Sequence, residues 1–600
     1  MAKPYCNILK KRKATIMKQA KKILAIFLSV LMLLSVMSVG ISATADAPIV
    51  IDDASDWDAY KQADGSYLLP KDGKFTVTAQ METLSANFNG NGSTITTCVP
   101  LFYNVSGVTV ENLTLEGNIT ATAKETAAVL SEYTTNFATI KNVVNNANVS
   151  LANFEFGNAT EGMGVAGLVG STSGGTTTIE NCINNGTITV HGKNIYASGI
   201  VGKIRNGFAT IINCVNNGNI ISTSDDDNND GAGGIIGFIY GGKSTVTITG
   251  CGNTGTISSK YLAAGIVARN YSRPNAISAC YNTGSVSATG TAGIAGGIDA
   301  TGTNASLNYC WNKGEVTAAI YAAQISAYGA SSEMLNNYYL DTVTAKAYAF
   351  VATDPTNEGA VAFTAAELAS GKLAYDINTA AEAQVFFQNI SATNSIPTSN
   401  PADGNVLKIG EKYLNLSIIT RDAASARIEE GNAGLRFATD IKKADYDALV
   451  ASGIAADTIK VGTIITPYEK IEDIEFLGEV FTVDKLEEGD YYDIPATLKT
   501  EGTDCYFRNS IVNISKADYD TDYAAIGYIQ FGETIIYSAN YTIRNVEQVA
   551  TAAYADRADA SADGYANSIS ASSAVAIDSK ATYSPYTEAQ LTILKAYIAE

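Results

Sequence analysis

The chain has 600 residues, of which 46% are hydrophobic and 17% charged, and its formal net charge is −20. This length exceeds one ordinary hydrophobic core, so either several domains or an elongated repeat array is expected. An acidic chain repels polyanions, which excludes nucleic acid and anionic membrane surfaces as favoured partners.

The first 45 residues have the composition of an export signal. Clusters of Lys and Arg precede an uncharged apolar run, Ile23–Val39, and Ala43-Thr44-Ala45 provides the small residues of a signal peptidase site. We therefore predict a signal peptide over residues 1–45, with Met17 as an alternative start and a mature chain that begins near Asp46. An uncleaved anchor is the alternative, because the apolar run is nearly long enough to span a bilayer.

Removal of this segment changes the charge balance. Residues 1–45 hold eight of the 40 basic residues and none of the 60 acidic ones, so the mature chain carries 32 basic residues against 60 acidic ones. We expect a secreted or cell-surface protein with no nucleic-acid partner and no membrane contact after the signal is cleaved.

One phrase recurs five times between residues 180 and 316: Cys, any residue, Asn, any residue, Gly, any residue, then Ile or Val. Its copies are ENCINNGTI, INCVNNGNI, TGCGNTGTI, SACYNTGSV and NYCWNKGEV, with cysteines at Cys182, Cys214, Cys251, Cys280 and Cys310 and asparagines at Asn184, Asn216, Asn253, Asn282 and Asn312. A second phrase, such as AGLVG at 166–170, precedes each copy, and degenerate copies extend the array at both ends. The step between copies varies from 27 to 39 residues. Insertions of variable length between constant phrases are typical of a solenoid.

The repeat predicts a parallel β-helix with two short apolar strands in each coil. A strand this short and glycine-rich cannot bury a face alone, but it can pair in parallel with its copy in the next coil, about 4.8 Å away. A series of antiparallel hairpins is the alternative, since Asn-Gly turns favour hairpins. The segments on the two sides of the turn differ in sequence, which favours the β-helix.

The repeated side chains then have structural roles. We expect the five cysteines to point into the coil as buried free thiols, in one column with Leu113 and Val143, and Asn337 takes the cysteine's place downstream. A straight column of thiols cannot surround a zinc ion tetrahedrally, and side chains that point the same way suit a disulfide poorly. Each Asn is expected to hydrogen-bond to the Asn of the next coil, and each Gly to turn a corner with positive φ.

The second phrase resembles the GLUG motif of exported bacterial proteins, most fully at Gly167-Leu168-Val169-Gly170. The stretch at 88–119 is similar to the lead-in of such proteins, and ASGKLAYDIN at 369–378 is similar to the helix that closes their arrays. The resemblance covers about residues 50–415. It implies a β-helix in a surface or secreted protein, adhesin-like in some members and joined to peptidase domains in others.

Residues 416–600 differ from the array. Apolar and polar residues alternate there, which predicts β-strands over 426–441, 460–469, 506–514 and 523–538. Thr587 and Gln590 form the capping box of a last helix, preceded by a loop rich in Ala and Ser at 558–586. The region resembles a C-terminal module that recurs in exported proteins of anaerobic Firmicutes, and this resemblance implies no particular activity.

These features predict a mainly β protein with five parts. They are a signal peptide at 1–45, an N-terminal cap with the first coils at 46–105, GLUG-type β-helix repeats at 106–345, a closing helix and linker at 346–415, and a β-rich module with flanking helices at 416–600.

The sequence offers little for catalysis. His191 is the only histidine, which excludes a HExxH zinc peptidase. Between positions 110 and 350 the acids are scattered singly and the arginines are Arg205, Arg269 and Arg273, so a lyase or glycosidase site is hard to assemble on one face. We therefore expect a protein that is not an enzyme and uses no cofactor.

Two groups of residues are candidates for binding. Asp226, Asn228 and Asp230 occupy positions of an EF-hand loop, but Gly237 stands where the bidentate Glu is needed, so a solvated loop is favoured over weak Ca²⁺ binding. Tyr281, Trp311 and Tyr338 directly follow the inward column and should point outward in three successive coils. This aromatic column suits a sugar chain or an apolar patch of a partner, and burial under a neighbouring segment is the alternative.

We therefore expect an exported, non-enzymatic protein that uses a β-helix for adhesion, through contact with a glycan or with a protein on a host or other cell surface. Two alternatives remain. One is a divergent carbohydrate-active β-helix enzyme, and the other is a β-helix spacer that presents the C-terminal module as the binding part.

Overall fold

The computed structural model describes residues 48–598, apart from 122–125, 158–161, 225–229, 241–243, 272–274, 302–304, 329–333, 344, 351–359, 473–481, 502–503, 539, 556–559, 562–563, 567–568, 571–572, 577–582 and 585. The predicted signal peptide and two of the predicted calcium ligands, Asp226 and Asn228, lie outside the described residues. Within them, no helix is long and apolar enough to cross a membrane.

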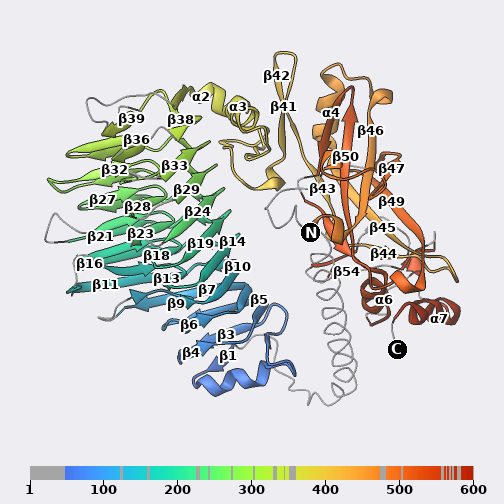
Figure 1. Cartoon of the computed structure of the whole chain (residues 1–600), viewed down its shortest axis with the longest axis horizontal. Coiled ribbons are helices and arrows are strands. Elements are labelled where there is room, and N and C mark those ends of the chain that lie inside the picture. Colours follow the sequence, from blue (N-terminus) through green and yellow to red (C-terminus); the bar gives the residue numbers. More distant parts are fainter. Residues whose placement is uncertain are drawn as a thin grey trace, which may run out of the picture.

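The strands between Ile49 and Phe363 form the predicted parallel β-helix, stacked coil upon coil along one axis (Figure 1). Each strand pairs in parallel with its copy in the next coil, as where Ile179 pairs with Ile211 and Ile211 with Ile248. The alternative of antiparallel hairpins is therefore wrong for the array. The reason is physical: each coil completes a turn before it meets its neighbour, so equivalent strands always run in the same direction.

A complete coil has five strand segments, numbered here as rows in chain order, instead of the two that the sequence predicts. The two repeated phrases lie at bends, with a strand on either side of each. First-row strands form an eight-stranded sheet, second-row strands form a seven-stranded sheet, and the other three rows belong to one 25-stranded sheet.

The row bounds are as follows. The first row holds β8 (Thr126–Ala127), β12 (Met163–Ala166), β17 (Ile195–Ser198), β22 (Gly231–Gly233), β27 (Leu262–Ala264), β32 (Ile294–Gly296), β36 (Tyr321–Tyr328) and β39 (Lys346–Phe350). The second row holds β4 (Met81–Leu84), β6 (Phe102–Ser106), β9 (Ser131–Thr135), β13 (Val169–Ser173), β18 (Val201–Arg205), β23 (Ile236–Tyr240) and β28 (Val267–Asn270). The third row holds β14 (Thr176–Glu180), β19 (Phe208–Ile212), β24 (Thr245–Thr249), β29 (Asn275–Ser278), β33 (Ala305–Asn308) and β37 (Met334–Leu335).

The remaining array strands complete the 25-stranded sheet. The fourth row holds β15 (Ile183–Asn184), β20 (Val215–Asn216), β25 (Gly252–Asn253), β30 (Tyr281–Asn282), β34 (Trp311–Asn312), β38 (Asn337–Leu340) and β40 (Ala360–Phe363). The fifth row holds β11 (Asn148–Glu155), β16 (Ile188–Lys193), β21 (Ile220–Thr223), β26 (Ile257–Ser259), β31 (Val286–Ala288) and β35 (Val316–Ala318). In the first coils the strands are β1 (Ile49–Ile51), β2 (Tyr67–Leu68), β3 (Lys74–Val77), β5 (Phe88–Thr97), β7 (Thr109–Thr120) and β10 (Phe137–Asn145), and the last three are long enough to span more than one row.

The core of the array is a set of stacked aliphatic columns. The last position of the cysteine phrase forms one of them, with Ile188, Ile220, Ile257, Val286 and Val316 all buried. The N-terminal end is sealed by the short helix η1 (Ala54–Tyr60), whose Trp57 is fully buried and lies 5.9 Å from the ring of Phe75 and 5.4 Å from that of Phe88. A capped end keeps the apolar interior of a solenoid from solvent.

A closing segment, residues 364–416, follows the last coil. It contains α2 (Ala365–Ser370), α3 (Lys372–Ala381), the short helix η2 (Pro401–Asp403) and the hairpin of β41 (Asn405–Ile409) and β42 (Lys412–Leu416). One side of the hairpin packs with α3 through Val406, and the other packs with the C-terminal module through Leu407 and Leu416. The closing segment therefore joins the array to the module, as Figure 1 shows.

The C-terminal module is built from two antiparallel sheets. One contains β43 (Ile418–Thr420), β44 (Ser425–Ala426), β45 (Ala433–Lys442), β48 (Lys499–Glu501) and β49 (Asp504–Ile514). The other contains β46 (Lys460–Pro467), β47 (Tyr492–Ala496), β50 (Tyr523–Phe531), β51 (Thr534–Tyr537) and β52 (Thr542–Arg544). The predicted strands at 460–469 and 506–514 are thus confirmed, whereas the predicted strands at 426–441 and 523–538 are each an antiparallel pair of strands joined by a turn.

Among the described residues, the module also contains three helices and four short helical turns. The helices are α4 (Lys443–Ala451), α6 (Val546–Ala555) and α7 (Glu588–Tyr597), and the turns are η3 (Ala456–Thr458), η4 (Tyr468–Lys470), η5 (Val483–Lys485) and η6 (Lys516–Asp518). The capping box of Thr587 and Gln590 is present at α7, as predicted. The stretch predicted as a loop holds two short strand pairs, β53 (Ala560–Ser561) with β56 (Tyr583–Ser584) and β54 (Ile569–Ser570) with β55 (Ser573–Ala576).

Candidate functional site

The cysteine column lies inside the array, as predicted. All five cysteines are free thiols with no exposed surface. The thiol of Cys251 donates to the carbonyl oxygen of Ile211 in the preceding coil at 3.6 Å, and burial raises its pKa well above the ordinary value. A thiol that stays neutral is a poor nucleophile and a poor metal ligand. The column is therefore part of the core.

The asparagine column forms a continuous hydrogen-bonded ladder. Each Nδ2 donates to the Oδ1 of the next member at 2.7 Å, along Asn145, Asn184, Asn216, Asn253, Asn282 and Asn312. The same Nδ2 groups donate to a backbone carbonyl two residues onward, as from Asn216 to Gly218 at 2.8 Å. The side-chain amide of Gln324 accepts from Asn312 and ends the ladder. The predicted bonding between Asn side chains of adjacent coils is confirmed.

Glycines are required in both phrases because of close approach, and not because of positive φ as the sequence predicts. A Cβ on Gly199 would stand 2.3 Å from Oδ1 of Asn216, so the glycine of the first phrase makes room for the asparagine of the second. A Cβ on Gly218 would stand 1.9 Å from the carbonyl oxygen of Gly186 in the preceding coil. The left-handed corner falls one residue before each cysteine position, with φ from 50° to 67°, at Asn112, Asn142, Asn181, Asn213, Gly250, Ala279, Tyr309 and Asn336.

The aromatic column is buried, so the prediction of an exposed binding platform is wrong. The rings of Tyr281 and Trp311 do point out of the coil and stack, with centroids 5.4 Å apart and planes 11° apart. Tyr281, Trp311 and Tyr338 are only 3%, 0% and 7% exposed, because the closing segment covers them. Phe363 and Phe386 lie edge-on to Trp311, with centroids 6.2 and 6.5 Å away.

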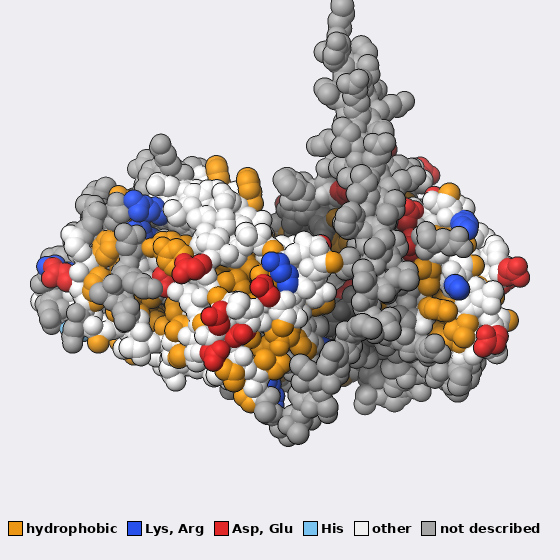
Figure 2. All heavy atoms as spheres, turned by 90° about the horizontal axis from the view of Figure 1, so that it is seen from below, with side chains coloured by type: hydrophobic (Ala, Val, Ile, Leu, Met, Phe, Trp, Pro, Cys, Tyr) orange, Lys and Arg blue, Asp and Glu red, His pale blue; other side chains and the backbone are white. Residues whose placement is uncertain are grey.

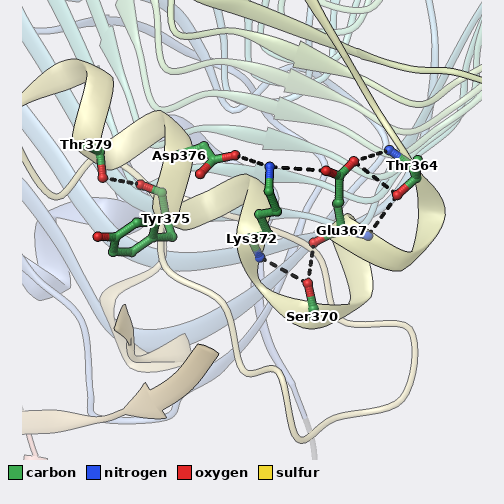
Figure 3. Close-up of polar contacts among 7 residues, drawn as sticks. All are labelled: Thr364, Glu367, Ser370, Lys372, Tyr375, Asp376 and Thr379. Atoms are coloured by element: carbon green, nitrogen blue, oxygen red, sulfur yellow. Dashed lines mark hydrogen bonds and ion pairs between the residues drawn. The ribbon is translucent and has the colours of Figure 1, made fainter. Parts of the chain in front are cut away.

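The helices that provide this cover are held by an ion triad (Figure 3). Lys372 Nζ lies 3.1 Å from Oε1 of Glu367 and 2.6 Å from Oδ2 of Asp376. The hydrogen bond to Asp376, followed by that to Glu367, raises the pKa of Lys372, and the backbone N–H of Thr364 lowers the pKa of Glu367. Because Lys372 is paired with both carboxylates, the triad is suited to orienting α2 against α3 and not to acid–base catalysis.

Of the three predicted calcium ligands, only Asp230 lies within the described residues. Asp230 is buried, and its carboxylate accepts from Ser222 at 3.5 Å and from Ser259 at 3.2 Å, in two adjacent coils. Burial raises the pKa of Asp230 to about 6. Asp230 is thus held inside the coil by these two serines. Within the described residues, no group of three or more His, Cys, Asp or Glu side chains is placed to hold a metal ion.

His191 lies on the fifth-row strand β16, and its Nδ1 is 2.9 Å from the hydroxyl of Thr223 in the next coil. This contact joins adjacent coils on the outside of the array. The acidic side chains on the face seen in Figure 2 stand in separate small groups among hydrophobic and uncharged ones.

A groove of about 490 Å³ lies where the closing segment meets the module. Its walls come from α3, β41 and the end of the β50–β51 hairpin, including Tyr375, Val406, Phe531 and Ile536. The charged residues that line it are Glu382 and Lys408, both exposed. One exposed acid and one exposed base provide no pair of carboxylates for acid–base work.

The outer face of the third row is regular and partly exposed. Its central column is threonine in five successive coils, with each residue in register with the next: Thr109, Thr139, Thr178, Thr210 and Thr247. A second column, two residues earlier on each strand, reads Phe137, Thr176, Phe208 and Thr245. We call these nine residues the threonine face.

The two phenylalanines of the threonine face are unusually exposed. Phe137 is 75% exposed and Phe208 is 59% exposed, whereas the residue that follows each of them, Ala138 or Ala209, is buried in the core. Burial of alternate residues fixes the strand, so the phenyl rings are held on a rigid surface. Sequence reasoning missed this face. The signal was present in the alternating segments FATI, TTTI, FATI and TVTI that precede the cysteine phrase.

Charged groups border the threonine face along one side. The next column along the strands contains Glu111, Lys141 and Glu180 in successive coils, followed by the uncharged Ile212 and Thr249. Lys141 Nζ forms an ion pair with Oε2 of Glu111 at 3.1 Å, and the side chain of Asn89 donates to the same carboxylate at 2.8 Å. The Glu111 carboxylate is therefore engaged in structural contacts.

Comparisons with known proteins identify no family. No family model matches the chain, and no curated protein matches it. Among solved structures, it is similar to a "putative immunoglobulin A1 protease from Bacteroides ovatus", with a TM-score of 0.31 and 17% identity over 60% of this chain and 94% of that one. It is also similar to a structure named "IgA1 Protease", with a TM-score of 0.30 and 16% identity over 54% of this chain and 24% of that one.

Proposed function

We propose that the protein is an exported, non-enzymatic binding protein that uses its β-helix for adhesion, by holding a glycan on the threonine face. The observation that carries this proposal is the exposure of Phe137 and Phe208, at 75% and 59%, on strands whose inner residues are fully packed. Aromatic rings held on a rigid, uncharged surface are suited to stacking against sugar rings.

The aromatic column under the closing segment does not serve this proposal, because it is already covered. The resemblance of the array to GLUG proteins and the predicted signal peptide support export. The engagement of Glu111 by Lys141 and Asn89 supports binding over hydrolysis, since a glycosidase needs two carboxylates poised on either side of a sugar bond.

The test is a glycan array probed with the mature chain, together with a panel of polysaccharides assayed for cleavage. We expect glycan retention without shortening of any polysaccharide. Thr210→Arg, which places a long charged side chain on the threonine face, should abolish retention. Thr189→Arg is the matched control, because Thr189 is an exposed threonine on the fifth-row strand β16.

Three outcomes would overturn the proposal. Cleavage of a polysaccharide would make the protein an enzyme. Equal retention by Thr210→Arg and by the unmodified chain would move the site away from the threonine face, with the C-terminal module as the next place to search. If no glycan is retained, the proposal that the ligand is a glycan is wrong.

A further inference from the structure

The two phenylalanines of the threonine face are spaced at a defined distance along the array axis. Phe137 pairs with Thr176 and Thr176 with Phe208, so the two phenyl rings lie in one column with a single threonine between them. Adjacent strands are about 4.8 Å apart, which separates the two rings by roughly 10 Å. This is close to the length of two sugar rings in an extended β-1,4-linked chain, in which every second ring presents the same face.

The central column provides one hydrogen-bonding group in every coil, which is half the distance between the two phenyl rings. Thr139, Thr178 and Thr210 offer one hydroxyl in each coil, and each hydroxyl both donates and accepts. A polymer that runs along the axis meets a new hydroxyl about every 4.8 Å. Sugar hydroxyls, which also donate and accept, match such a row in either orientation.

The charges around the face select an uncharged ligand. Neither column of the threonine face contains a charged residue, although the whole chain has a formal net charge of −20. Glu180 borders the face beside Thr178, so a polyanionic glycan would be repelled there. A polycation would meet the same Glu180 in the bordering column but no acidic residue in either column of the threonine face itself.

We propose that the threonine face binds a single neutral, extended, β-1,4-linked glycan chain that runs along the array axis, with alternate sugar rings stacked on Phe137 and Phe208. This inference rests on the proposed glycan-binding function and names its ligand class and orientation. A short ligand engages one phenyl ring, and a longer one engages both.

The experiment is calorimetric titration of the mature chain with a cello-oligosaccharide series of disaccharide, tetrasaccharide and hexasaccharide. We expect affinity to rise from the disaccharide to the hexasaccharide. Phe208→Ala should weaken hexasaccharide binding about tenfold and remove the gain in affinity with length. Tyr492→Ala is the matched control, because Tyr492 is an aromatic residue of the C-terminal module that is 55% exposed.

The outcomes separate this inference from the proposed function. Equal hexasaccharide affinity in Phe208→Ala and the unmodified chain would overturn the inference, as would tighter binding of a uronate oligosaccharide of the same length. If another glycan class is bound and lost in Thr210→Arg, the function stands and the ligand class is wrong. If no glycan is bound at all, both fall. Circular dichroism of each variant confirms that the array is folded.

Discussion

Polar side chains inside the array differ in how well their hydrogen bonds are satisfied. Asn216 is fully buried and bonds to the asparagines above and below it and to a backbone carbonyl. Asp299 is also fully buried, and its neighbours in the adjacent coils are Val267 and Ser326. One of its carboxylate oxygens has no hydrogen-bond partner among the described residues, and the other accepts from the N–H of Thr301 at 3.4 Å. Burial raises the pKa of Asp299 from 3.8 to about 7.

We predict that Asp299 makes the array less stable as pH rises. The folded pKa lies above the unfolded one, so the native state holds the proton more tightly than the unfolded state does. The stabilisation is complete below about pH 4 and is lost as pH rises toward about 7. Asp299→Val restores the residue type found at Val267, and should raise the free energy of unfolding at about pH 8 by a few kcal/mol.

Denaturant unfolding at several pH values tests this prediction. The difference between Asp299→Val and the unmodified chain should be larger at about pH 8 than at about pH 5. Asp457→Asn, at an exposed position in η3, is the control and should show no such trend. Parallel pH profiles for the unmodified chain and Asp299→Val would contradict the prediction.

The positions of the cysteine column require small apolar side chains. Cys251→Asp would place a charge among fully buried neighbours and should cost several kcal/mol of stability. Cys251→Val should cost less, because Val143 already occupies the equivalent position in an earlier coil and is itself fully buried. Thermal unfolding of the two variants gives the comparison.

Chemical reactivity gives a second check on the same column. The five buried thiols should resist alkylation in the folded protein and all react once denaturant is added, without a reductant. Cys98, which is exposed, should react at once and serves as the internal reference. A disulfide between any two of the five in protein purified without air would contradict this reading.

At the scale of the element, the two phrases of the repeat act as one unit. The asparagine ladder runs along the second phrase, and the glycine of the first phrase stands against it, as Gly199 does against Asn216. Each coil therefore needs both residues for the same contact. This explains why two phrases separated in sequence recur together in every complete coil.

We predict that a buried and an exposed asparagine in the same phrase differ sharply in their contribution. Asn216→Ala removes the ladder bonds to Asn184 and Asn253 and leaves buried partners unsatisfied, which should cost about 2–5 kcal/mol. Asn217→Ala, the next residue, removes exposed bonds to Asn185 and Thr254 and should change stability by about 0.5 kcal/mol or less. Equal effects of the two substitutions on denaturant unfolding would contradict the ladder's importance.

A double-mutant cycle tests the link between the phrases. Gly199→Ala should destabilise the array, because the new Cβ would overlap both the Asn216 amide and the carbonyl oxygen of Gly234. In the background of Asn216→Ala the same change should cost clearly less, with a coupling on the order of 1 kcal/mol. Gly157→Ala is the control, since a Cβ there meets no atom within 4 Å. Additive effects would show that the two phrases are independent.

At the scale of the whole molecule, the closing segment decides which outward faces stay free. It covers the fourth-row aromatic column through Leu368 and Phe386, and the hydroxyl of Ser399 donates to the carbonyl oxygen of Gly250 at 2.6 Å. It also packs against the module through Leu407 and Leu416. The threonine face keeps Phe137 and Phe208 exposed.

We predict that Trp311→Ala detaches the closing segment from the array. Trp311 is fully buried between Tyr281, Phe363 and Phe386, and loss of such a side chain typically costs about 3–5 kcal/mol. Hydrogen exchange should increase in α2 and α3, while the early coils keep their protection. Glycan binding should be unchanged, because the aromatic column is not the binding site.

Two results would contradict this prediction. Loss of glycan binding with normal protection of α2 and α3 would restore the aromatic column as a ligand platform. Loss of protection throughout the array would show that Trp311 supports every coil and not only the closing segment.

The sequence by itself determined the period of the array, the parallel pairing, the inward cysteine column and the asparagine ladder. In a solenoid the neighbours of a residue are its own copies one coil away, so Cys251 and Asn253 meet side chains that the repeat already names. The strands of the C-terminal module and the cap of α7 were also predictable, because alternation and capping are local patterns.

Only the tertiary structure decided which outward residues are free to bind. Tyr281 and Phe208 both point out of a coil, but the first is buried under residues that follow the array and the second is not. The difference depends on where α2 and α3 dock, a contact between segments far apart in the chain that no repeat encodes. The corners at Ala279 and Tyr309 likewise follow from coil closure, since the stacked coils impose a left-handed turn on residues that do not favour it.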